Sequence, residues 1–380
     1  MTRSPHPLRV FLVCTGVGIM NRGLETFARN CFDHLQDLDG LDLHLFKGAG
    51  EDSEREHCLW TIPRTSPLAE RIGRGIRRNG YVVEQLSSVL PLVPWIRRLR
   101  PQVIFYSDSN LGFQLYYWRK WIGVPYHLLF SNGAPIGPNF PRTDFVHQVT
   151  PYFRDLALGA GEPQQRQFMV PYGIDVPLGE PSYDPHQRQE RRKKLHLPGD
   201  RPIVLSVGAI DPQSHKRMDY LINEIAQLPE PRPFLVLLGH MPPGSEIHIQ
   251  QAQEQLGETG FTARSVPSDQ VLDYYQAADL FALASLQEGF GRVYLEALSQ
   301  GLPCFVHDHP VMRYVLGDQG YYGDFSQPGA IAQQLPELLR QPLSPETMAQ
   351  RRQSIRDRFS WPVLGPKYLE MFQACCQLNS

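Results

Sequence analysis

Two glutamates on either side of a glycine-containing turn form the most specific chemical pattern in the chain. Glu288 stands before the turn, and Glu296 lies in the helix predicted to follow it. The turn consists of Gly289, Phe290 and Gly291. An α-helix takes about 3.6 residues per turn, so Glu296 lies about two turns deeper, and unpaired N–H groups at the helix start can bind phosphate and sugar oxygens. One carboxylate can therefore hold sugar hydroxyls while the other holds a ribose diol.

A second pattern places two cations just before a helix. The strand predicted to end at Gly208 continues into a polar loop that contains Lys216 and Arg217, and helical periodicity follows. A compact ammonium at the start of a helix suits a phosphate oxygen, because the helix N-terminus also attracts anions. The alternative is a solvated helix end, since most charged side chains lie on protein surfaces.

A loop near the N-terminus could also face an anion. Gly16 and Gly18 follow the first predicted strand, and Gly23 stands where a helix is predicted to begin. Asn21 occupies the third glycine position of the dinucleotide-binding fingerprint G-x-G-x-x-G, so the fingerprint is broken and a dehydrogenase is disfavoured. The loop is either a phosphate-binding turn or a tight strand-to-helix connection.

The elements that must position these residues alternate along the chain. Short apolar runs are separated by helical patterns, which indicates parallel sheets covered by helices. Two doubly wound α/β domains are predicted at 1–175 and 203–358, with a linker rich in Pro, Gly and charge at 176–202 and a final helix at 359–380. A cleft is expected between the two domains.

Composition narrows the classes of function. The 380 residues are 42% hydrophobic and 20% charged, as in packed globular proteins, and a formal net charge of -2 gives no general attraction to nucleic acid. Six cysteines without C-x-x-C spacing are expected to be reduced thiols in a cytoplasmic protein. No uncharged apolar run reaches the roughly 18 residues of a membrane span, so the chain is expected to be soluble or peripheral.

Together these motifs resemble the GT-B retaining glycosyltransferases, in particular the GT4-like group. EGFGRVYLEALSQGLP matches the E-x7-E signature of that family, SVGAIDPQSHKRMDYLI its diphosphate-binding loop, and VPYGIDV its interdomain segment. GVGIMNRGLETFA and FSWPVLGPKYLEMF resemble its N-terminal glycine loop and its C-terminal helix. The resemblance covers nearly the whole chain. It implies two Rossmann-like doubly wound domains facing a central cleft, with the C-terminal helix crossing back to the first domain.

The resemblance also implies roles for the residues on the donor side. Glu288 would hold donor-sugar hydroxyls with the main-chain amides of 289–291, and Glu296 would hold the ribose. Lys216 would neutralise the departing diphosphate. Further donor contacts are expected at Gly23, Gly208, Gly239 and Val266.

The sequence departs from the family pattern at two positions. The usual arginine of the second domain is Ala209 here, so Arg217 or Arg292 is expected to supply the missing positive charge. The usual histidine of the first domain is Ser107 here. The candidates for binding or activating the acceptor are then Asp108, Asn132 and His147.

The function implied by the resemblance is retaining transfer of a sugar from a UDP- or GDP-sugar to an acceptor hydroxyl. The nucleotide sugar is a co-substrate, and neither another cofactor nor an obligatory metal is expected. A nucleotide-sugar epimerase of similar fold and a non-catalytic nucleotide-sugar-binding protein are the alternatives. The metal-like patterns Asp37-Leu-Asp39 and His307-Asp308-His309 are each explained by polar surface or a polar turn.

The segment from Arg71 to Arg100 is strongly basic. It contains seven arginines and a single acid, Glu84. One interpretation is contact with anionic lipid or an acidic acceptor, which would make the protein peripheral at the inner membrane face. The other is a solvated face over core aromatics, and it is favoured by Pro91 and Pro94, which interrupt the helical stripe.

Overall fold

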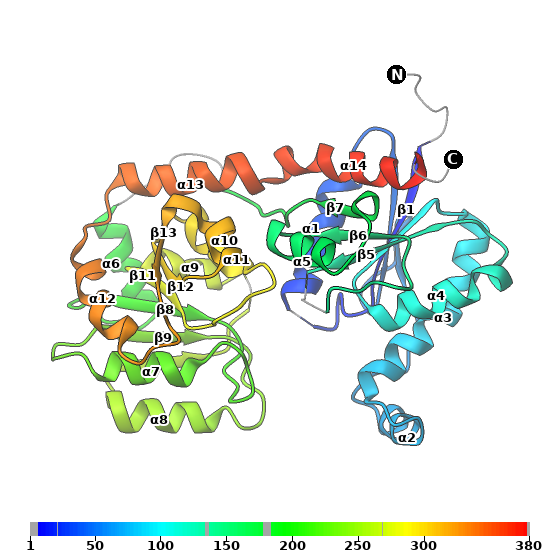
Figure 1. The fold of residues 1–380 in the computed structure, drawn as a ribbon. Coiled ribbons are helices and arrows are strands. Elements are labelled where there is room, and N and C mark those ends of the chain that lie inside the picture. Colours follow the sequence, from blue (N-terminus) through cyan, green and yellow to red (C-terminus); the bar gives the residue numbers. More distant parts are fainter. Residues whose placement is uncertain (1–6, 21, 134–136, 178–183, 268, 378–380) are drawn as a thin grey trace. The chain divides into compact units, whose positions relative to one another are not determined.

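The computed structural model describes residues 7–20, 22–133, 137–177, 184–267 and 269–377, and the chain divides into two compact units (Figure 1). Met1–Gly173 and Trp361–Ser380 belong to the first unit, and Ile174–Ser360 to the second. Each unit contains one parallel β-sheet with helices around it (Figure 1). The α/β class and the two doubly wound sheets predicted from the sequence are confirmed.

The first unit is built on a seven-stranded sheet in the order β3-β2-β1-β4-β5-β6-β7. Its central strands are continuous apolar runs, as expected where helices cover both faces of a parallel sheet. In β1, every residue from Val10 to Cys14 is at most 4% exposed. The strands are β1 (Leu8–Cys14), β2 (Leu41–Lys47), β3 (Glu56–Cys58), β4 (Val103–Tyr106), β5 (His127–Asn132), β6 (Phe145–Gln148) and β7 (Gln167–Met169).

The last helix of the chain packs on this first sheet. Its buried residues recur at helical spacing, so they form one apolar stripe. Phe372 packs edge-on against Phe105 of β4, with ring centroids 5.5 Å apart, and the Tyr368 hydroxyl donates to the carbonyl of Pro171 at 3.0 Å. The helices of this unit are α1 (Gly23–Leu35), α2 (Pro67–Gly75), α3 (Gly80–Leu99), α4 (Ser109–Ile122), α5 (Pro151–Gly159) and α14 (Trp361–Gln377).

The second unit is built on a six-stranded sheet in the order β10-β9-β8-β11-β12-β13. The strands are β8 (Ile203–Val207), β9 (Phe234–Leu238), β10 (Phe261–Arg264), β11 (Leu280–Leu283), β12 (Cys304–His307) and β13 (Gly320–Gly323). The helices are α6 (Pro185–Lys194), α7 (Met218–Ala226), α8 (Glu246–Leu256), α9 (Val271–Ala277), α10 (Arg292–Ser299), α11 (Pro310–Leu316), α12 (Ala330–Arg340) and α13 (Pro345–Phe359).

The described part of the predicted linker at 176–202 belongs to the second unit. It contains α6, a helix with almost no apolar side chains, which is held to the unit by charge. Arg192 and Arg188 both pair with Asp279, at 2.6 Å and 2.8 Å. The sequence pattern predicted a linker because a charged helix of this kind has no apolar stripe. The residue that holds α6 to the unit, Asp279, lies far along the chain, so the local pattern does not indicate it.

Both sheets reverse their strand order at one place. In the first sheet the reversal lies between β1 and β4, and in the second between β8 and β11. At such a switch point the loops beyond the carboxyl ends of the two strands diverge, which leaves room for a ligand. Each unit therefore has one position where the fold itself favours a binding site.

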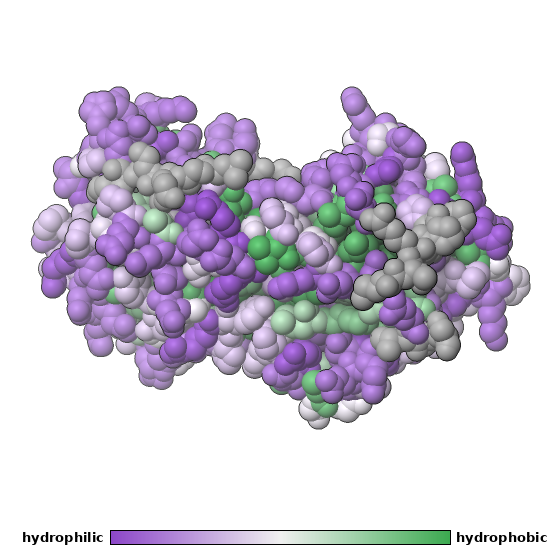
Figure 2. All heavy atoms as spheres, turned by 90° about the horizontal axis from the view of Figure 1, so that it is seen from above, coloured by the Kyte–Doolittle hydropathy of each residue, from purple (hydrophilic) through white to green (hydrophobic). Residues whose placement is uncertain are grey.

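The surface drawn in Figure 2 is mainly hydrophilic, with apolar residues in limited areas between polar ones. Some exposed apolar surface is normal for a globular protein. Among the helices that the structure describes, none is both long and apolar enough to cross a membrane.

Candidate functional site

Lys216 and Glu288 meet at the switch point of the second sheet. Lys216 lies in the loop after β8, and Glu288 lies in the loop after β11, the neighbouring strand. The distance from Lys216 Nζ to Glu288 Oε1 is 2.6 Å, and His215 Nε2 lies 3.5 Å from the same oxygen. The structure thus brings together two sequence patterns that are 72 residues apart.

The Glu288 carboxyl is held in its ionised form. The residue is 6% exposed, and burial by itself raises the pKa of a carboxyl. Here Lys216 and His215 outweigh burial, so the pKa of Glu288 is lowered to about 2. An ammonium has three N–H donors, so Lys216 can bind a second acceptor while it remains paired. The pair therefore places a carboxylate, which can bind hydroxyl groups, next to an ammonium, which can bind a phosphate oxygen.

Gly208 and Gly239 leave the space that the stem of Lys216 and the neighbouring loops need. A Cβ on Gly208 would lie 3.0 Å from Lys216 Cγ, so the stem of the lysine packs directly over this glycine. A Cβ on Gly239 would lie 1.7 Å from the carbonyl oxygen of Gly208. A side chain at Gly239 would therefore push apart the loops that follow β8 and β9.

The turn after Glu288 is anchored by aromatic packing. Phe290 is 2% exposed, and its ring centroid lies 5.9 Å from that of Phe359. Gly291 has a φ of +82°, and a Cβ there would lie 2.3 Å from the ring of Tyr294. Only glycine fits this left-handed position, and the turn delivers the main-chain amides of 289–291 to the start of α10.

Glu296 is oriented by a partner that the sequence pattern did not indicate. The hydroxyl of Tyr275, on α9, donates to Glu296 Oε2 at 3.0 Å. Burial and the nearby Glu296 raise the pKa of Tyr275, so the hydroxyl keeps its proton and remains a donor. Tyr275 is one of two adjacent tyrosines in α9, and the sequence does not distinguish it from an ordinary core residue.

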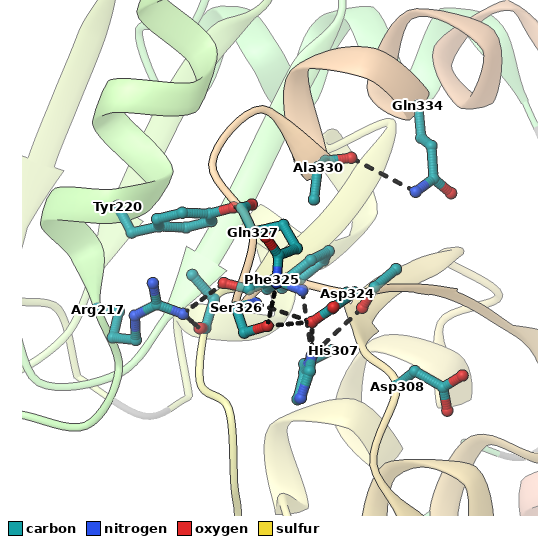
Figure 3. A network of polar contacts seen from close by, with 12 residues as sticks. Arg217, Tyr220, His307, Asp308, Asp324, Phe325, Ser326, Gln327, Ala330 and Gln334 are labelled. Atoms are coloured by element: carbon teal, nitrogen blue, oxygen red, sulfur yellow. Dashed lines mark hydrogen bonds and ion pairs between the residues drawn. The ribbon is translucent and has the colours of Figure 1, made fainter.

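Arg217 is bound to main-chain carbonyls (Figure 3). Its guanidinium donates to the carbonyls of Phe325 at 2.8 Å and Ala284 at 3.3 Å, and it lies 4.2 Å from the ring centroid of Tyr220. These bonds tie the end of β11 to the loop after β13. Arg292, the other expected cation, is the first residue of α10 and is 9% exposed.

His307 and Asp308 of the sequence His307-Asp308-His309 lie in this same region (Figure 3). His307 Nδ1 accepts the N–H of Phe325 at 3.1 Å, and the Asp308 carboxylate pairs with Arg313 at 2.5 Å. His309 Nδ1 accepts an N–H at the start of α11. Within the described residues, no group of three or more His, Cys, Asp or Glu side chains could hold a metal ion.

The other predicted donor contacts lie in separate loops. Gly23 is the first residue of α1 in the first unit. In the second unit, Gly239 follows β9 and the half-buried Val266 follows β10, the adjacent strand. The loops of Gly239 and Val266 therefore extend from the same edge of the sheet as the loop of Lys216.

The three acceptor-side candidates lie in the first unit, and two of them are engaged within its sheet. Asn132 donates to the side chain of Gln148 at 2.9 Å. His147 is fully buried, with Nδ1 at 3.0 Å from the Ser131 hydroxyl and Nε2 at 2.6 Å from the carbonyl of Val170. Burial lowers the pKa of His147 to about 4, so the ring is neutral near pH 7.

The third candidate, Asp108, lies at the switch point of the first sheet. It is 6% exposed and occupies the position just before α4, beyond the end of β4. The hydroxyl of Tyr81 donates to its carboxyl group. Burial raises the pKa of Asp108 to about 7, with a further contribution from the nearby Glu25 that Arg64 partly offsets.

We predict that Lys216→Met, which removes the charge and keeps most of the volume, destabilises the protein in a pH-dependent way. At pH 7 the free energy of unfolding should fall by about 3 kcal/mol, because a buried carboxylate loses its partner. The native pKa of Glu288 lies below its ordinary value of 4.5. The pair therefore stabilises the native protein above pH 4.5, and this stabilisation is lost as the pH falls towards 2.

Urea titrations from neutral to acidic pH measure this difference. The gap between the two proteins should narrow below pH 4.5. Lys193→Met is the matched control, because Lys193 forms an exposed pair with Glu190 and should leave stability nearly unchanged. A gap for Lys216→Met that stays constant with pH would contradict the assigned pairing.

Comparison with known proteins finds a family model that matches most of the second unit. Residues 187–356 match the family model of glycosyl transferases group 1, and this range contains both Lys216 and Glu288. The chain is 28% identical over 173 residues to the alpha-monoglucosyldiacylglycerol synthase of Streptococcus pneumoniae, which is 44% of this chain and 39% of that protein. It is also 28% identical over 227 residues to the D-inositol 3-phosphate glycosyltransferase of Xylanimonas cellulosilytica, covering 57% of this chain and 54% of that one.

Solved structures share the fold over nearly the whole chain. The sucrose-phosphate synthase of Thermosynechococcus elongatus has a TM-score of 0.75 at 18% identity, covering 98% of this chain and 99% of that one. Alr3699/HepE of Anabaena, solved in complex with UDP and glucose, has a TM-score of 0.74 at 14% identity, covering 97% and 100%. The second unit therefore matches the group 1 glycosyl transferases over residues 187–356, and the chain as a whole has the GT-B fold.

Proposed function

We propose that this protein transfers a glycosyl unit from a nucleotide sugar to an acceptor hydroxyl, with retention of the anomeric configuration and without an obligatory metal or other cofactor. The observation that carries the proposal is the buried pair of Lys216 and Glu288 at the switch point of the second sheet. A nucleotide sugar presents hydroxyl groups next to a diphosphate, which are the groups that a carboxylate and an ammonium bind.

The chain would contribute to this reaction mainly through electrostatic interactions. The bond between the anomeric carbon and the diphosphate oxygen breaks as the acceptor oxygen bonds to that carbon, so negative charge develops on the leaving diphosphate, which takes up the proton that the acceptor hydroxyl loses. Lys216 would neutralise this charge, and Glu288 would hold the donor-sugar hydroxyls. Glu296, oriented by Tyr275, would accept hydrogen bonds from the ribose hydroxyls. Positioning of this kind lowers the entropy cost of the reaction.

We propose a UDP- or GDP-sugar as the donor. Support for uridine comes from the Anabaena neighbour, whose structures were solved with UDP and with UDP-glucose. The base would lie beside the backbone of Gly239 and Val266, in the loops after β9 and β10.

Incubation with UDP-glucose or GDP-mannose, a panel of hydroxyl acceptors and EDTA tests the reaction. We expect release of nucleoside diphosphate and, from an α-linked donor, an α-linked product recognised by its anomeric coupling in NMR spectra. A β-linked product would contradict retention, and loss of activity in EDTA would contradict metal independence. Conversion of the donor without an acceptor would indicate an epimerase, and binding without turnover would indicate a binding protein.

Two substitutions should affect different kinetic constants. Lys216→Ala should lower turnover roughly 10²- to 10³-fold, the scale for removing one preorganised group that stabilises developing charge. Glu296→Ala should mainly raise the KM for the donor, because a ribose contact is similar in the ground and transition states. Lys193→Ala serves as the control. Normal turnover of Lys216→Ala at saturating donor would exclude the assigned role.

On the acceptor side, we propose that Asp108 holds the acceptor hydroxyl. It lies at the switch point of the first sheet, where Glu25 of α1 packs against Gly16 beyond β1. Two buried oxygens at this position, Glu25 Oε2 and Gln85 Oε1, have no hydrogen-bond partner among the described residues. Oxygens of this kind accept hydrogen bonds, so they favour a ligand that donates them, such as a sugar or another polyol.

The raised pKa of Asp108 predicts how activity depends on pH. Below pH 7 the carboxyl is largely protonated, and above pH 7 the carboxylate can accept a hydrogen bond from the acceptor. The kcat/KM for the acceptor should therefore rise from about pH 6 to pH 8 in the wild type and lose this rise in Asp108→Asn. Asp155→Asn, at an exposed position of α5, is the control. An identical rise in Asp108→Asn would rule out Asp108 as the titrating group.

We propose a cytoplasmic location with peripheral contact at the inner membrane face. The support is the distribution of charge in the segment Arg71 to Arg100. Four of its arginines are exposed on α2 and the turn after it, and three are exposed at the end of α3. The single acid of the segment, Glu84, is buried and paired with Arg64. The exposed charge of this segment is therefore entirely positive.

A further inference from the structure

Helix α4 of the first unit carries aromatic side chains on the face that should be polar. Its buried residues, Leu111, Gly112, Leu115 and Ile122, face the core. The remaining surface carries aromatic residues at helical spacing, which we call the α4 aromatic stripe. The stripe consists of Phe113 (42% exposed), Tyr116 (39%), Tyr117 (53%), Trp118 (38%) and Trp121 (85%). An amphipathic surface helix has charged or polar residues at such positions.

The described part of the chain does not cover this stripe. The Arg142 guanidinium lies 4.2 Å from the ring centroid of Phe113 and donates to the Tyr117 hydroxyl at 2.9 Å, yet both rings remain exposed. Trp121, at the end of the helix, is the most exposed member of the stripe. Contiguous apolar surface of this kind marks an interaction site, because leaving it in water is unfavourable.

The surroundings of the stripe are positively charged. The ends of α3 and α4 are joined, since Arg97 donates to the carbonyls of Trp121 at 2.9 Å and Ile122 at 3.2 Å. Residues 90–127 contain five cations and one acid, Asp108, which is buried, and one of the five cations, Arg119, is paired with Asp144 at 2.5 Å. Arg97, Arg98, Arg100 and Lys120 are exposed near this end of the two helices.

The exposed aromatic rings and the cations beside them together favour a membrane surface as the partner of the stripe. Trp and Tyr rings have an apolar body and a polar edge, and they concentrate at the level of lipid headgroups. Exposed lysine and arginine beside them attract anionic headgroups. A second copy of the chain would bring like charges together across the contact, and a neutral glycan would leave the cations unmatched.

We propose that the α4 aromatic stripe docks the first unit on an anionic membrane surface. The rings enter the headgroup region while Lys120 and the arginines at the end of α3 contact the lipid phosphates. This inference deepens the proposed peripheral location by naming the inserting helix. It concerns membrane binding rather than the transfer reaction, so the two proposals can fail separately.

Co-sedimentation with vesicles tests the proposal on the full chain. Vesicles of phosphatidylcholine with phosphatidylglycerol should bind the wild-type protein, vesicles of phosphatidylcholine alone should bind it weakly, and added salt should weaken binding. Replacing Tyr117 and Trp121 together by alanine should reduce binding about tenfold or more. Trp60→Ala is the matched control, because Trp60 is 67% exposed but lies outside the stripe.

The outcomes separate this proposal from its alternatives. Equal vesicle binding by the double variant and the wild type would overturn it, as would equal binding to neutral and anionic vesicles. Dimerisation that the double variant abolishes, without vesicle binding, would assign the stripe to a second copy instead. Thermal stabilisation by UDP should be the same in both proteins, which shows that the variant is folded and leaves the transferase proposal unaffected.

Discussion

A buried carboxylate beside an ammonium is stable only when surrounding elements hold both groups in place. In the second unit, Lys216 and Glu288 form such a pair, and the elements around them must hold both side chains. Its 2.6 Å contact exists because β8 and β11 are neighbours, so the loops that follow them leave the sheet side by side. Gly208 and Gly239 permit the close approach of the strand ends. Arg217 then ties the end of β11 to the loop after β13.

The two units use the same topological position with opposite electrostatics. Glu288 and Asp108 are both buried carboxyls beyond a strand at a switch point. The pKa of Glu288 is lowered to about 2 because a lysine and a histidine lie against it, whereas burial raises that of Asp108 to about 7. Burial favours the neutral acid, and an adjacent cation reverses that preference. Similar positions in the fold can thus keep one carboxyl ionised at neutral pH and hold the pKa of another near neutral pH.

Arginine has a structural role in this chain as well as a surface one. Arg352 and Arg192 are buried, and each donates to a backbone carbonyl, of Ser299 and Ala277 respectively. The guanidinium offers several donors in one plane, so a single side chain can satisfy carbonyls from separate loops. The many arginines are therefore not simply a solvated positive surface. The exposed cations near the ends of α3 and α4 differ from these buried arginines, because their charges face the solvent.

The sequence by itself determined the two parallel sheets and the patterns that contain Lys216, Glu288 and Glu296. These features are local: apolar runs alternate with helical periodicity, and each motif lies within one strand, loop and helix. The resemblance built on those motifs predicted the fold that the family match and the structural neighbours support.

Only the tertiary structure decided which distant residues became partners. Tyr275 orients Glu296, Asp279 holds α6 to the second unit, and His147 is enclosed within the first sheet. The structure also leaves the aromatic residues of α4 exposed, Trp121 to 85%. Periodicity reports which residues share a face of an element, but burial and pairing depend on what packs against that face, and those partners lie far away in the sequence.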